Sequence, residues 1–216
     1  MDLEFITTYY QFFLSGTINT VLLAFFSVLG GTMVGVILAL MKLSEKKPVK
    51  FLASAYIEFV RGTPLLVQLF LIYYGLPHIG IDLPDMVAGI FAVSLNSGAY
   101  VAEIIRGGIQ SIDKGQMEAG RSLGMSYKMT MKEVIIPQAF KNILPALGNE
   151  FIVIIKESAI VSVIGIHELM YKTDVVRGIT YKPFTPLIVA AIIYFVLTFS
   201  ISKFLGIAER SMRASD

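Results

Sequence analysis

Five apolar stretches, each about as long as a membrane-spanning helix, dominate the pattern of hydrophobic and polar positions. An apolar run of about 20 residues forms a helix that crosses a hydrocarbon layer about 30 Å thick. The pattern therefore predicts an all-α membrane protein with one domain, residues 1–216, and five transmembrane helices. We expect these helices at residues 17–41, 51–76, 85–105, 143–166 and 185–202.

Two polar interruptions subdivide this pattern. The second stretch contains Gly62-Thr63-Pro64, where we expect a kink because proline cannot continue the helical hydrogen bonds. A charged segment, residues 107–137, separates the third and fourth stretches. Within it we expect a short helix at Glu118–Leu123 that ends at Gly124, followed by a second amphipathic helix that stops at Pro137.

Composition supports the membrane assignment. Hydrophobic residues make up 55% of the chain and the mean hydropathy is +0.71, whereas soluble domains are about 45–50% apolar. The absence of cysteine excludes disulfides, thiolate nucleophiles and cysteine-ligated metals. A net charge of +2 is too small to indicate a nucleic-acid partner.

The distribution of Lys and Arg predicts how the chain is oriented, because cytoplasmic loops are enriched in both. The connector His167–Lys182 contains only three basic residues, Lys172, Arg177 and Lys182. We therefore place it on the outer side of the membrane and interpret it as an outer helix and turn. The N-terminus is therefore expected outside, with the charged segment and the C-terminus in the cytoplasm. The residues on the predicted cytoplasmic side are Lys42, Lys46, Lys47, Lys50, Arg106, Lys114, Arg121, Lys128, Lys132, Lys141, Lys203, Arg210 and Arg213.

Ionisable residues inside the predicted spans share helical faces. Each costs at least a few kcal/mol at membrane depth, so such groups normally face a bundle interior or a watery cavity. The helical period places these residues together: Glu58, Arg61, Leu65 and Gln68 in the second span; Asn96, Tyr100 and Glu103 in the third; Glu150 and Glu157 in the fourth.

The depths of these residues predict a polar layer that binds a small solute. Glu58, Glu103 and Glu150 should form an acidic tier about 8–10 Å from the bilayer centre, toward the cytoplasm. The alternative is that neighbouring charges pair structurally, Glu58 with Arg61 and Glu103 with Arg106. The predicted solute-binding residues are Glu58, Arg61, Thr63, Asn96, Tyr100, Glu150, Lys156, Glu157 and Ser158.

Sequence motifs of catalysis are missing from the chain. It contains no G-x-x-x-x-G-K-[ST] phosphate loop. It also lacks G-x-S-x-G and H-E-x-x-H. We therefore expect neither catalytic residues nor a metal site, and nucleotide hydrolysis, if it drives this protein, should occur in another chain.

The charged segment resembles the EAA loop of ATP-binding-cassette (ABC) importer permeases. That pattern is E-A-A, three residues, G, nine residues, then I-x-L-P, and this chain has EAG at 118–120, Gly124 and VIIP at 134–137. Three longer segments are similar to polar amino-acid permeases of that superfamily, such as the membrane subunits of histidine, arginine and glutamine transporters. They are EFVRGTPLLVQLFLIYYGLP, NSGAYVAEIIRGGIQSIDKGQMEAGRSLGMS and IIPQAFKNILPALGNEFIVIIKESAI.

The resemblance implies a type I ABC importer transmembrane domain in a bacterial inner membrane, working within a larger complex. It implies two permease subunits, identical or closely related, two ATP-binding subunits that hold ATP and Mg²⁺, and an amino-acid-binding protein outside the cell. No cofactor is then expected in this chain. The residues that would couple to the ATPase are Glu118, Ala119, Gly120, Arg121, Ser122, Leu123 and Gly124.

Buried acids outnumber buried bases, which favours an amino acid with a cationic side chain: arginine, lysine or histidine, with glutamine next. Two alternatives stay open at this stage. In the first, the protein is an ion-coupled carrier that uses the same charged layer. In the second, it is a membrane scaffold that transports nothing and uses the charged segment to assemble with a partner.

Overall fold

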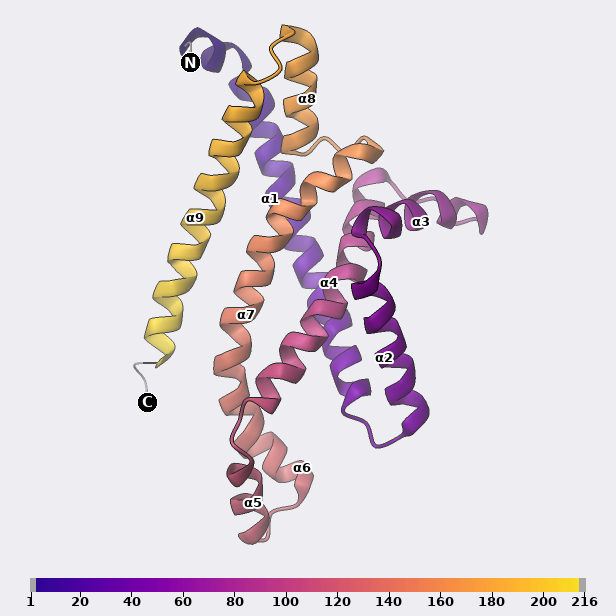
Figure 1. The fold of residues 1–216 in the computed structure, drawn as a ribbon, viewed down its shortest axis with the longest axis vertical. Coiled ribbons are helices and arrows are strands. Elements are labelled where there is room, and N and C mark those ends of the chain that lie inside the picture. The colour runs from indigo at the N-terminus through magenta and orange to yellow at the C-terminus, as the bar shows by residue number, and fades with distance from the viewer. Residues whose placement is uncertain (1–2, 214–216) are drawn as a thin grey trace.

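The computed structural model describes residues 3–213 of the predicted 1–216 domain. Residues 1–2 and 214–216 lie outside the described residues, so the membrane sides predicted for the two termini stay predictions. Every regular element within residues 3–213 is helical (Figure 1). The elements are α1 (Leu3–Lys42), α2 (Lys47–Gly62), α3 (Leu65–His78), α4 (Asp85–Gln110), α5 (Lys114–Ser122), α6 (Tyr127–Thr130), the π-helical η1 (Met131–Ile135), α7 (Ile136–Glu157), the 3₁₀-helical η2 (Ser158–Ile164), α8 (Leu169–Thr180) and α9 (Thr185–Arg213).

The long helices α1 and α4 cross at close range because small residues line the contact. A Cβ atom placed on Gly31 would lie 2.8 Å from Cβ of Ser97, and one placed on Gly30 would lie 2.6 Å from Oγ of Ser94. Small residues let membrane helices approach until their backbones nearly touch. This crossing fixes α4, which carries much of the predicted polar layer, against the longest helix.

The expected kink in the second span is a complete break. Thr63 and Pro64 are both extended, and the axes of α2 and α3 differ by 108°. Pro64 supplies no N–H, and the residue before a proline is pushed out of the helical region. Residues 51–76 are therefore not one continuous helix.

The prediction that an amphipathic helix stops at Pro137 is wrong. Pro137 lies in the first turn of α7, where the missing N–H costs no helical hydrogen bond. The preceding π-helical turn η1 connects α6 to α7, and the N–H of Ile136 donates to Met131 O. A wider π turn accommodates one extra residue, so the chain continues as a helix through the proline.

Three described helices, α1, α4 and α9, are long and apolar enough to cross a membrane, and the bent pair α2–α3 adds a fourth if it forms one crossing. Helix α7 carries Lys141, Glu150, Lys156 and Glu157, which lower its apolar character. The connector expected at His167–Lys182 does form a helix, α8. The charged α5–α6 segment and α8 lie at opposite ends of the molecule (Figure 1).

Candidate functional site

The break between α2 and α3 is closed by one buried amide, Gln68. Its Nε2 donates to the carbonyl oxygens of Val60 at 2.8 Å and Thr63 at 3.1 Å. Its Oε1 accepts a 2.9 Å hydrogen bond from Nδ2 of Asn96 on α4. Because unpaired carbonyls cost several kcal/mol inside a membrane, Gln68 both stabilises the break and ties it to α4.

Gln68 was placed on the polar face from its spacing but was not predicted to be a site residue. The amide that satisfies the broken backbone comes from α3 itself, one turn past the break. The signal was present in the sequence, since a long amide follows a proline break within an apolar run. Asn96, a predicted site residue, is engaged by this amide and is only 6% exposed.

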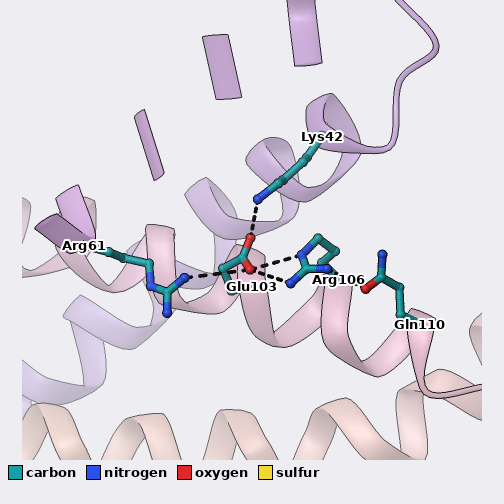
Figure 2. A network of polar contacts seen from close by, with 5 residues as sticks. All are labelled: Lys42, Arg61, Glu103, Arg106 and Gln110. Carbon is teal, nitrogen blue, oxygen red and sulfur yellow. Dashed lines mark hydrogen bonds and ion pairs between the residues drawn. The ribbon is translucent and has the colours of Figure 1, made fainter. Parts of the chain in front are cut away.

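Glu103 on α4 lies at the centre of a cluster of cations (Figure 2). Its Oε1 contacts Lys42 Nζ at 2.6 Å, and its Oε2 contacts Arg106 Nη2 at 2.7 Å and Arg61 Nη1 at 3.8 Å. The structural pairing of Glu103 with Arg106, considered as an alternative to a solute role, is therefore present. Three cations around one carboxylate leave it little negative field to offer a ligand.

Arg61 lies near Glu103 and over the ring of Tyr100. Its guanidinium carbon is 5.5 Å from the Tyr100 ring centroid, within the range of a cation–π contact. Arg61, Tyr100 and Glu58 are exposed to the surroundings of the single chain, and Thr63 is partly buried. The described ion pairs of Arg61 thus run to α4 and not to Glu58, its neighbour one turn away on α2.

The carboxylates of α7 have a different environment. Glu150 Oε1 accepts a 3.0 Å hydrogen bond from the hydroxyl of Ser97 on α4. Glu157 and Lys156 are exposed, at the point where α7 tightens into the 3₁₀ helix η2. Ser158 is fully buried and its hydroxyl donates to Ile155 O at 2.7 Å. Among the described residues, neither Glu150 nor Glu157 forms an ion pair within 4 Å.

The predicted layer is therefore divided into two electrostatic parts. Glu103 on α4 is surrounded by basic side chains from α1, α2 and α4. Gln68 on α3 and Asn96 on α4 form a closed amide pair. On α7, Glu150 has one hydroxyl donor and Glu157 lies beside Lys156, and no described ion pair within 4 Å involves either carboxyl group. The acidic groups of α7 thus differ from Glu103, because no described basic side chain forms an ion pair with them.

The charged segment is held in a defined shape by caps at both ends of α5. The Asp113 side chain accepts from the N–H of Gly115 at 2.6 Å. At the other end, Met125 N donates to Gly120 O and Gly124 N donates to Arg121 O, both at 3.1 Å, which is a Schellman motif. Gly124 has φ +85°, so the predicted end of this helix at Gly124 is confirmed.

Gly120, where the EAA pattern has alanine, packs directly on α6. A Cβ atom there would lie 2.6 Å from Cγ2 of Thr130, which is fully buried. The glycine therefore permits close contact between α5 and α6. The other predicted coupling residues are all exposed: Glu118, Ala119, Arg121, Ser122, Leu123 and Gly124. Among them Leu123 is 84% exposed.

Within residues 3–213, no group of three or more His, Asp or Glu side chains is arranged to hold a metal ion. The expectation of no metal and no cofactor stays a prediction.

The chain matches the family of binding-protein-dependent transport system inner membrane components over residues 31–214. It is 44% identical to the arginine transport system permease protein ArtQ of Bacillus subtilis (strain 168), with 100% of both chains covered. It is also 44% identical to the putative glutamine transport system permease protein GlnP of Rickettsia bellii, over 94% of each chain.

Two solved structures of ABC transporters contain chains with a similar fold. The crystal structure of an amino acid ABC transporter with histidines contains a chain that is 55% identical, with a TM-score of 0.94, covering 98% of this chain and 99% of that one. A chain of the inward-facing MetNI methionine ABC transporter has a TM-score of 0.75 at 18% identity and covers 98% of this chain and 99% of its own, which shows the shared fold alone.

Proposed function

The chain belongs to the family of binding-protein-dependent transport system inner membrane components, and we propose that it forms the path of a polar, cationic amino acid through an ATP-driven importer. The family match and the similar amino-acid transport proteins confirm the resemblance to amino-acid ABC permeases. Arginine, lysine and histidine are the favoured substrates, with glutamine next. The names of the relatives include both arginine and glutamine transport proteins.

The contrast between Glu103 and the two carboxylates of α7 carries this proposal. Glu103 contacts Lys42, Arg106 and Arg61, whereas Glu150 accepts one hydroxyl hydrogen bond and Glu157 is exposed. A carboxylate at membrane depth without a cationic partner is costly, and a cationic substrate would lower that cost while it is bound.

The remaining predicted residues would complete the binding of a zwitterion. Arg61 and Lys156 would attract the substrate carboxylate, while Glu150 and Glu157 attract its cationic side chain. Glu58, Thr63 and Tyr100 would line the path. Asn96 and Ser158 are engaged with Gln68 and Ile155, so they would join only when α4 and η2 move.

The proposed assembly and membrane orientation are those that the resemblance to ABC importer permeases implies. Five spans would cross a bacterial inner membrane with the N-terminus outside and the charged segment in the cytoplasm. Two permease subunits, identical or closely related, would assemble with two ATP-binding subunits and receive substrate from an external binding protein. The α5 surface, Glu118–Gly124, would dock in the ATPase, and closure of two ATPases would shift the permease between two arrangements.

Uptake into proteoliposomes that contain the purified permease and its co-purified ATPase tests this function. We expect ATP-dependent accumulation of labelled arginine or lysine that persists after all ion gradients are collapsed. Glu150→Gln and Glu157→Gln should each lower uptake and substrate-stimulated ATP hydrolysis by roughly tenfold, since one charge-assisted hydrogen bond contributes about 1.5–3 kcal/mol.

Glu45→Gln provides the matched control, because Glu45 is an exposed residue of the first loop and the substitution removes the same charge. Uptake that stops when ion gradients collapse would replace the proposal with an ion-coupled carrier. Complex assembly without any solute uptake would support the scaffold. Normal stimulation in both α7 variants would remove the cation-binding role of these carboxylates.

A further inference from the structure

A groove of about 580 Å³ lies between the last turns of α1, the end of α4 and the segment from α6 into α7. Its walls are mainly apolar and include Val36 and Leu40 of α1, Ile105 of α4, and Phe140 and Leu147 of α7. The volume is within the range of about 300–1,000 Å³ found for ligand pockets. It is therefore large enough to hold a molecule.

None of the predicted solute-binding residues lines this groove. On α4 the groove residues Ile105 and Ile109 lie about half a helical turn round from Asn96 and Tyr100, at about 100° per residue. The two sets of side chains therefore point to opposite sides of α4. Leu40 and Phe140 in its walls are 64% and 53% exposed, so the groove faces either lipid or another protein.

The length of the groove corresponds to one leaflet of a bilayer. Its α7 wall extends from Ile136 to Leu147 and its α1 wall from Thr32 to Leu43. Each wall rises by about 16 Å at about 1.5 Å per residue. Half of a hydrocarbon core about 30 Å thick is nearly the same length.

One end of the groove is basic and amphipathic. Tyr127, Lys128 and Lys132 line the groove where it meets the charged segment. Tyrosine and lysine side chains are typical of the headgroup level of a membrane. Lys132 Nζ lies 3.3 Å from Glu133, but their side chains are 79% and 53% exposed. Such surface pairs are weak, so Lys132 stays available to a phosphate.

We propose that this groove binds an anionic phospholipid, with an acyl chain along α1 and α7 and the phosphate between Lys128 and Lys132. The occupant follows from three observations together: apolar walls, a length of one leaflet, and two ammonium groups at the headgroup end. A basic site between membrane helices at this level is a suitable place for an anionic headgroup.

Lipid retention measured by native mass spectrometry tests the proposal. The full-length chain, with any subunits that co-purify, is loaded in detergent with phosphatidylglycerol or with phosphatidylcholine. We expect the wild type to retain phosphatidylglycerol preferentially, and the Lys128→Gln/Lys132→Gln variant to lose this preference by about an order of magnitude, since each lysine near an anionic surface contributes about a fivefold factor in affinity.

Two further variants check the position and the sign of the effect. Lys46→Gln/Lys47→Gln removes the same charge from two residues that do not line the groove, and should leave retention unchanged. Glu133→Gln should increase it. Equal retention of the two lipids by the wild type, or unchanged retention in the Lys128/Lys132 variant, would overturn the proposal.

A second copy of the chain is the competing occupant. Because the chain contains no cysteine, a Leu40→Cys variant has a single thiol within the groove. We expect it to form no disulfide cross-link on oxidation in the membrane and to react with a lipophilic maleimide. Efficient formation of a disulfide-linked dimer would show that protein covers the groove, and would contradict the lipid assignment.

Discussion

Glu168 shows what one buried carboxylate does outside the spans. It caps α8 by accepting from Met170 N at 2.8 Å and Tyr171 N at 2.7 Å, and it also accepts from the hydroxyl of Tyr194 on α9 at 3.0 Å. Thr20 of α1 accepts from the N–H of Leu169 at 3.1 Å. The carboxylate therefore joins three helices at one end of the molecule.

The stability contributed by Glu168 should depend on pH. Burial raises the pKa of this carboxyl although several donors to it act in the opposite direction. A raised folded pKa means that the stabilisation from protonation is complete below the unfolded pKa, about 4.3, and is lost as pH rises through the folded pKa. The wild type should therefore lose stability relative to Glu168→Gln as pH increases from 4.5.

Thermal unfolding of both proteins in detergent across this pH range measures the difference. Glu45→Gln, at an exposed position, corrects for the general effect of removing one carboxylate. If the stability of the wild type relative to Glu168→Gln instead increased with rising pH, the hydrogen bonds to the charged carboxylate would outweigh the cost of its burial.

Of the two pairings within one helix that the spacing suggested, Glu103 with Arg106 is present and Glu58 with Arg61 is not, and the contacts between helices were not predicted. The Glu103–Arg106 pair follows from i, i+3 spacing, and the structure contains it. The contacts of Glu103 with Lys42 and of Glu168 with Tyr194 join residues far apart in the chain. Helical period gives the face of a residue but not its partner, which depends on how the helices cross.

At the scale of the elements, two adjacent glycines on α4 have different tasks. A Cβ atom on Gly108 would overlap the side chain of Ile143 on α7, whereas one on Gly107 would meet nothing within 4 Å. Gly30, Gly31 and Gly108 thus mark close contacts between helices, whereas Gly107 lacks a close neighbour on another helix.

This difference gives a prediction with a built-in control. Gly107→Ala should raise stability by up to about 1 kcal/mol, because alanine favours a helix over glycine. Gly108→Ala should lower stability by about 1–3 kcal/mol, the usual cost of overpacking. Ile143→Ala should restore most of the loss in Gly108→Ala. Thermal unfolding of the four proteins tests this, and equal effects at the two glycines would contradict the packing.

The location of helices could be predicted, but the form of their interruptions could not. Asp85 begins α4, as the apolar pattern predicted. The Gly62-Thr63-Pro64 break was expected to bend the chain, but neither the 108° angle nor the hydrogen bond from Gln68 to the open carbonyl of Val60 follows from the apolar pattern. The π turn before Pro137 likewise has no signal in that pattern.

At the scale of the whole molecule, the two ends present different exposed side chains. Leu123, at the end of α5, is 84% exposed, and Tyr181, after α8, is 91% exposed. These segments lie at opposite ends of the long axis (Figure 1). Between them, α4 and α7 run through the polar layer and connect it to the charged segment, so a force applied at α5 can reach both helices.

The exposed Leu123 gives the last prediction. If α5 docks in the ATPase, burial of this side chain would contribute about 1.5–3 kcal/mol. Leu123→Ser should therefore weaken binding of the ATPase by about 10–100-fold. Tyr181→Ser removes a larger exposed side chain at the opposite end and should leave ATPase binding unchanged. Affinities of the two purified variants for the ATPase, measured in detergent, separate these outcomes. Equal affinities would exclude Leu123 from the docking surface without affecting the proposed substrate site, because the α7 carboxylates are tested by uptake.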